Sequence, residues 1–177
     1  MGTAAVQDPK IPAVAADGSL YPIGKMAAHR QGVLHLAVSI FVTCRGRLLI
    51  QRRALSKYHC GGLWANTCCS HPHWRETAAD AARRRLAEEL GITGVTLTPM
   101  GELAYRADVG GGLVEHEHVH LFHGAAPDAL TLDPDPEEVS DTRWIGVEEL
   151  RGELGSDASR FAPWFRIYAD RRPDLMG

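Results

Sequence analysis

Trp64-Ala65-Asn66-Thr67-Cys68-Cys69-Ser70-His71-Pro72, with the arginine-rich stretch 83–91 that follows it, decides the fold predicted for this chain. Side chains alternate along an extended segment, so Cys69 and His71 are expected on one face and Cys68 on the other. A thiol beside a potential metal ligand, followed by a helix with carboxylates, predicts a reactive site. The alternative is packing, because many buried cysteines are inert small hydrophobes.

The stretch that follows is predicted to be a helix ending before Gly91, a residue suited to the position just past a helix end. Thr77 with Asp80 three residues later resembles a capping box, and Asp80 lies four residues before Arg84, as an ion pair requires. Apolar residues recur at every fourth position and would face a core: Ala78, Ala82, Leu86 and Leu90.

The rest of the chain predicts strands mixed with helices, which favours an α/β or α+β sandwich. Residues 1–16 are expected to form a loose, flexible lead-in, and residues 17–177 one domain. The expected strands are 34–42, 47–52, 95–107, 113–123 and 142–145, and further helices are expected near 147–154 and 163–171.

Composition limits the functional classes. The net charge of −3 gives no reason to expect nucleic-acid binding, and no run of about 18 apolar residues predicts membrane insertion. Without an export signal at residues 1–10, the four cysteines are expected to be free thiols in a cytoplasmic protein. No feature predicts an obligate protein partner.

Strand 113–123 carries Glu115 and Glu117 in an otherwise apolar row. Burying two carboxylates usually requires a metal or a raised pKa. The alternative is an edge strand with both carboxylates in water. His116, His118 and His120 on the opposite face are expected to be solvated or partly buried.

Two further groups suggest ligand binding. His29 and His35, together with His71, Glu115 and Glu117, would supply three imidazoles and two carboxylates, a set that suits Mn²⁺, Zn²⁺ or Fe²⁺ better than Mg²⁺. Basic residues at 25, 52, 53 and 57 either form a solvated face or hold an anion such as a diphosphate.

The spacing from Ser70 through Glu76 to 84–92 resembles the Nudix box. Two positions depart from it, because Ser70 replaces a glycine and Arg85 replaces a glutamate. In Nudix hydrolases the helix glutamates gather Mg²⁺ ions that activate water. The arginine therefore weakens hydrolysis as the expected function while keeping the expected Nudix-like α/β/α sandwich with a mixed sheet.

Nearly the whole chain, residues 21–171, resembles the type I isopentenyl-diphosphate isomerases. The matching pieces are 25–29, 35–37, 52–57, 64–72, 105–107, 114–117 and 161–164. The resemblance implies that one Mn²⁺ or Zn²⁺ is bound by His29, His35, His71, Glu115 and Glu117. It implies Mg²⁺ on Glu89 and the backbone carbonyl of Cys69, and diphosphate binding by Lys25, Arg53, Lys57 and Arg85.

The same resemblance implies interconversion of isopentenyl and dimethylallyl diphosphate, with Cys69 on one face of the substrate and Glu117 with Tyr105 on the other. Trp164 would cover the isoprenoid end, where an indole stabilises a carbocation without attacking it. Nearby positive charge is expected to lower the pKa of the Cys69 thiol. A Nudix diphosphate hydrolase and a non-enzymatic zinc-binding or interaction protein remain as alternatives.

Overall fold

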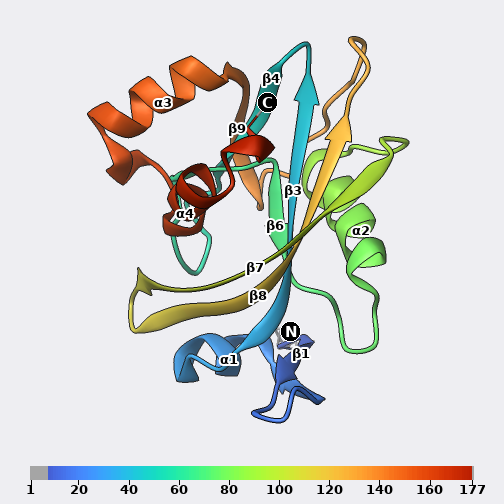
Figure 1. Cartoon of the computed structure of the whole chain (residues 1–177), viewed down its shortest axis with the longest axis vertical. Coiled ribbons are helices and arrows are strands. Elements are labelled where there is room, and N and C mark those ends of the chain that lie inside the picture. The colour runs from blue at the N-terminus through green and yellow to red at the C-terminus, as the bar shows by residue number, and fades with distance from the viewer. Residues whose placement is uncertain (1–7, 177) are drawn as a thin grey trace, which may run out of the picture.

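The computed structural model describes residues 8–176, in which helices lie on both sides of a mixed β-sheet (Figure 1). The strands are β1 (Lys10–Val14), β2 (Leu20–Gly24), β3 (His35–Cys44), β4 (Arg47–Arg53), β5 (Trp64–Ala65), β6 (Cys68–Ser70), β7 (Leu97–Gly110), β8 (Leu113–Ala125) and β9 (Val139–Gly146). The helices are α1 (Lys25–Gln31), α2 (Ala78–Leu90), α3 (Val147–Ser156) and α4 (Pro163–Arg171), with 3₁₀ turns at Ala158–Arg160 and Pro173–Leu175.

Strand β3 is the centre of the sheet and connects the parts of the site. It pairs with β8 in parallel and with β1, β4 and β6 antiparallel. β8 returns against β7 in a long hairpin, and β9 pairs with β4. One strand thus lies beside both β6, which carries Cys69, and β8, which carries Glu117.

The two faces of β3 pack against different helices. Val38 and Ile40 lie in a core cluster with Leu86 and Leu90 of α2. Phe41 lies in the other cluster, which includes the buried aromatic residues of α4. Alternation along one strand thus separates two cores, and the predicted α/β/α sandwich is confirmed (Figure 1).

Helix α2 begins and ends where the sequence predicts. The Thr77 side chain accepts a hydrogen bond from the Asp80 backbone N–H, and Gly91 ends the helix with φ at +67°. A side chain at Gly91 would also contact Asp133. The predicted Asp80–Arg84 pair is wrong, because Asp80 pairs with Arg83.

Thr77→Ala is expected to destabilise the protein by about 1 kcal/mol, because it leaves an N-terminal N–H of α2 without its cap. For a chain of this length that loss corresponds to a decrease in melting temperature of roughly 2–4 °C. Thermal unfolding followed by circular dichroism measures it, with Thr77→Ser as the control that keeps the hydroxyl. Equal melting temperatures for the alanine and wild-type proteins would contradict the capping role.

The expected loose segment at 1–16 is wrong for Lys10–Val14, which forms β1 and pairs with β2. Ile11 and Ala13 are buried there, and Ala13 pairs with His35 of β3. Pairing across a turn at 17–18 overrides the weak local signal of small residues. Residues 1–7 lie outside the described part of the chain. Within residues 8–176, no helix has the length and apolarity needed to cross a bilayer.

Candidate active site

A small cavity of about 30 Å³ brings most of the predicted site residues together. They come from α1, β4, the loop after it, β6, α2 and β8. The lining residues are Lys25, Arg53, Lys57, Tyr58, His59, Cys69, Ser70, His71, Arg85, Glu89, Glu115, Glu117 and Glu138. Segments far apart in sequence thus contribute polar side chains to one cavity beside β3.

Four predicted metal ligands form one buried group. His29, His35, His71 and Glu117 can each offer a ligand atom, and these atoms all lie within 4.8 Å of one another. The parallel register of β3 and β8 places His35 opposite Glu117. His71 follows β6, and its Nε2 lies 2.9 Å from a Glu117 carboxylate oxygen.

The hydrogen bonds of these histidines leave ring nitrogens available as ligands for a metal ion. Nδ1 of His29 donates to the Lys25 carbonyl and Nδ1 of His35 donates to the Val33 carbonyl, each at 2.7 Å. Because a carbonyl can only accept, the neutral His29 ring carries its lone pair on Nε2, which has no partner among the described residues. Burial lowers the pKa of His29, and that of His71 to about 3, so both rings stay neutral. Lone pairs that converge on a carboxylate fit a divalent cation.

Glu115 belongs to a second, overlapping group, in which its ligand atom and those of His29 and His59 lie within 4.8 Å of one another. His59 Nε2 is 3.3 Å from Glu115 Oε1. His59 was missed by the sequence analysis, because no regular spacing connects it to the other ligands. Its position depends on the loop between β4 and β5.

Tyr105 connects the two carboxylates. Its hydroxyl lies 2.8 Å from Glu115 Oε2 and 2.7 Å from Glu117 Oε2, although one hydroxyl hydrogen can serve only one of them. Burial and the charge of Glu117 raise the pKa of Glu115 well above its usual value. Burial opposes ionisation of Glu117 too, but the His35 and His71 imidazoles hold its pKa well below the usual range. The Tyr105 hydroxyl therefore bridges one carboxyl group that favours its protonated form, Glu115, and one that favours its charged form, Glu117.

Cys69 faces the same cavity from β6, opposite Ser39 in the strand register. Its Sγ donates to Asn66 Oδ1 at 2.9 Å and lies 3.1 Å from Ser39 Oγ. Cys68 points into the core under α2, as alternation predicted. The expected decrease in the pKa of the Cys69 thiol is wrong for this structure, because burial raises it. The sulfur carries its proton here.

The predicted diphosphate-binding cations also meet at the cavity. Lys57 and Arg85 both contact Glu138, at 2.5 Å and 3.2 Å. Burial and the nearby Lys57 and Arg85 charges lower the pKa of Lys25 to about 8. Arg53 lines the cavity, whereas Arg52 is exposed and donates to a loop carbonyl.

Two other predicted residues are buried beside these cations. Glu89 on α2 accepts hydrogen bonds from Arg85 at 2.7 Å and from Gln51 at 2.9 Å. Trp164 on α4 is 1% exposed, and the Arg53 guanidinium lies 5.2 Å from its ring centre. The outer-face histidines of β8 are only partly buried, as expected.

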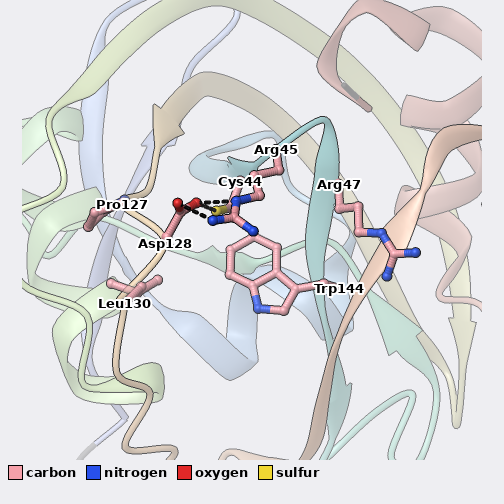
Figure 2. A pocket seen from close by; sticks show the side chains of 7 residues that line it. All are labelled: Cys44, Arg45, Arg47, Pro127, Asp128, Leu130 and Trp144. Carbon is pink, nitrogen blue, oxygen red and sulfur yellow. Dashed lines mark hydrogen bonds and ion pairs between the residues drawn. The ribbon is translucent and has the colours of Figure 1, made fainter.

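A larger cavity of about 280 Å³ lies at the other end of β3, near the turn into β4. Figure 2 shows Cys44 and Arg45 both directed at Asp128, with Trp144 beside them. The ten residues from His35 to Cys44 span about 30 Å of extended chain. Both groups of potential metal ligands found among residues 8–176 lie at the smaller cavity or next to it, and none of their members lines the larger one.

Comparison with known proteins agrees with this site. The chain matches the family described as NUDIX domain over residues 33–165. It is 51% identical over 160 residues to the Isopentenyl-diphosphate Delta-isomerase of Rhodobacter capsulatus, covering 90% of this chain and 91% of the relative. The protein of the same name from Dinoroseobacter shibae is 53% identical over 152 residues, covering 86% of each.

Solved structures with low sequence identity share the fold alone. A protein from Deinococcus radiodurans aligns with a TM-score of 0.68 at 18% identity, covering 83% of this chain and 89% of that one. A MutT Nudix hydrolase from Burkholderia pseudomallei aligns with a TM-score of 0.61 at 18% identity, covering 78% and 98%.

Proposed function

Because this chain belongs to the isopentenyl-diphosphate Delta-isomerase family within the Nudix fold, we propose that it interconverts isopentenyl diphosphate and dimethylallyl diphosphate. The observation that carries the proposal is the placement of a thiol and of a carboxylate hydrogen-bonded to Tyr105 around one small cavity. Moving the double bond requires one carbon to gain a proton and a neighbouring carbon to lose one. Two proton-transfer groups on different strands suit that reaction.

Cys69 and Glu117 are the two groups that exchange protons with the substrate. They lie on β6 and β8, on two different strands paired with β3, and line the same cavity. The Tyr105 hydroxyl contacts both Glu117 and Glu115, so the phenol can exchange a proton with Glu117 during turnover. The double bond shifts with no change in the diphosphate.

Water must be kept from the carbocation character that develops on the substrate. The indole of Trp164 is almost completely buried on the α4 side, next to the ring of His59. A cavity of about 30 Å³ has room for roughly one water molecule, so the substrate enters only if the surrounding side chains move. An indole face stabilises the cation and offers no nucleophile.

Two divalent ions complete the proposed site. His29, His35, His71, Glu115 and Glu117 would hold Mn²⁺ or Zn²⁺. Glu89 and the backbone carbonyl of Cys69 would hold the Mg²⁺ that accompanies the diphosphate. Bound cations supply positive charge that stabilises the ionised carboxylate and thiolate. Lys25, Arg53, Lys57 and Arg85 would bind the diphosphate oxygens.

The catalytic efficiency is expected to fall above pH 8, by up to about tenfold per pH unit, as Lys25 loses its proton. Below that pH the lysine is charged and binds the diphosphate, and above it the charge is lost. Measuring kcat/KM from neutral to alkaline pH tests this. Lys25→Arg should keep its charge and lose the inflection near pH 8; an unchanged inflection in that variant would assign it to another group.

The test of the proposed function is a proton NMR time course of isopentenyl diphosphate in D₂O with the protein, Mg²⁺ and trace Mn²⁺ or Zn²⁺. Dimethylallyl signals that grow with deuterium incorporation, without free phosphate, would support the isomerase. Release of phosphate without the allylic product would favour a diphosphate hydrolase. Arg85 argues against hydrolysis, since it stands where the Nudix box has a glutamate and is paired with Glu89.

A further inference from the structure

Glu138 extends its carboxylate into the group of cations expected to bind the diphosphate. Its Oε2 accepts a hydrogen bond from Lys57 Nζ at 2.5 Å, and its Oε1 lies 3.2 Å from Arg85 Nη2. The side chain is 23% exposed. Its backbone is anchored as well, because its carbonyl accepts from the Ala54 N–H and its N–H donates to the Asp135 carbonyl. The Glu138 residue is therefore fixed both at its backbone and at its carboxylate.

Glu138 also lies between the site and the adjoining surface depression. Glu138 lines the small cavity and an adjoining depression of about 210 Å³, and so do Lys25 and Arg85. The depression is also lined by the exposed Pro9 and by the buried Ile11 of β1. A phosphate group that approaches through this depression meets the Glu138 carboxylate on the cations it needs.

We propose that Glu138 determines the specificity of the site: its carboxylate occupies the place of a phosphate group on Lys57 and Arg85, and the ligand must displace it. This inference rests on the proposed function, because it assumes that these cations bind the diphosphate. No local pattern in the sequence marks Glu138 for this role.

The selectivity among phosphate ligands depends on whether the displaced carboxylates of Glu89 and Glu138 find a new cation. Arg85 is paired with Glu89 as well as with Glu138, so a ligand that takes this guanidinium leaves two carboxylates without their partner. A partly buried carboxylate without a counter-charge is costly. A diphosphate that brings Mg²⁺ supplies a new cation for them, whereas a metal-free diphosphate or a monophosphate does not. Glu138 therefore selects for metal-loaded diphosphates.

Glu138→Gln tests the proposal by isothermal titration of the full-length protein with inorganic pyrophosphate, with and without Mg²⁺. Removing the competing charge is expected to tighten metal-free pyrophosphate binding about five- to tenfold and to reduce the gain from Mg²⁺. Inorganic orthophosphate should bind more tightly too. Glu137→Gln is the matched control, because Glu137 is an exposed neighbouring carboxylate without an ion pair in the described residues. It should leave both affinities unchanged.

Glu138→Asp provides a second variant if the glutamine variant does not fold. Its shorter side chain withdraws the charge from Lys57 and Arg85, so metal-free pyrophosphate should bind about two- to threefold more tightly. Weaker or unchanged binding in a folded variant would overturn the proposal and make Glu138 a residue that only orients the cations.

The titration also separates this inference from the proposed function. Tighter pyrophosphate binding in a protein that shows no isomerisation by NMR would refute the isomerase and retain the role of Glu138. Isomerisation together with unchanged pyrophosphate affinity in both variants would support the isomerase and refute the role of Glu138. A wild-type protein that binds no pyrophosphate under either condition would overturn the inference, whatever its activity.

Discussion

Cys69→Ala is expected to lower turnover of isopentenyl diphosphate by about 10²- to 10⁴-fold, the contribution of a positioned acid–base group. The thiol faces the cavity, and its hydrogen-bond partners are the hydroxyl of Ser39 and the amide of Asn66. Neither partner exchanges a proton readily near neutral pH, so neither can replace the thiol. The NMR assay measures the loss directly.

The fold and the metal content should change little in this variant. Cys69 is partly exposed and is not among the residues that form the metal-ligand groups. A loss of about 1 kcal/mol in the free energy of unfolding is expected for truncating one such side chain. The control is Cys68→Ala, on the opposite face and fully buried under α2, which should lower stability while keeping turnover. A large loss of stability with unchanged turnover in Cys69→Ala would make Cys69 a core residue.

Glu117→Gln is expected to impair both metal retention and catalysis. The carboxylate lies 2.9 Å from His71 Nε2 and 3.6 Å from His35 Nε2, and its other oxygen contacts Tyr105. An amide has no charge to offer a cation and cannot carry the exchanged proton. We expect roughly 10- to 100-fold weaker Mn²⁺ or Zn²⁺ binding and turnover lowered by about 10³-fold even at saturating metal.

Two measurements separate these effects: metal titration of the chelator-treated protein, and kcat at saturating metal. Glu102→Gln is the matched control on β7, where an exposed carboxylate pairs with His118 and His120 away from the metal-ligand groups. It should leave both quantities unchanged. Full turnover of Glu117→Gln at saturating metal would restrict Glu117 to holding the ion, and unchanged affinity would remove it from the metal site.

Local patterns predicted the elements that carry the chemistry. The alternation that puts Cys69 on one face and Cys68 on the other is a property of any extended chain, and the structure confirms it. Helix α2 was predicted from its cap at Thr77 and its terminal Gly91, since both act within a few residues. The error at Lys10–Val14 has the same origin, because that strand depends on pairing with β2 and β3.

The electrostatics of the site were less predictable. The pKa of the Cys69 thiol is raised because the surrounding fold shields most of the side chain from water, and sequence proximity to His71 carries no information about that burial. The hydrogen bonds of the Tyr105 hydroxyl to the two carboxylates depend on the strand register, which pairs Tyr105 of β7 with Glu117 of β8. His59 enters the site through a loop whose path no periodic pattern describes.

The sequence by itself determined the α/β/α fold, the identity of the thiol, the imidazoles and the carboxylates, and the departure at Arg85. Each of these depends on residue type, or on spacing within one element or one motif. Only the tertiary structure decided that His59 and Glu138 belong to the site and which groups carry protons there. Lys57 and Glu138 are 81 residues apart, and such contacts arise only when separate strands and loops pack together. Burial and partner charges, which set proton affinity, exist only after that packing.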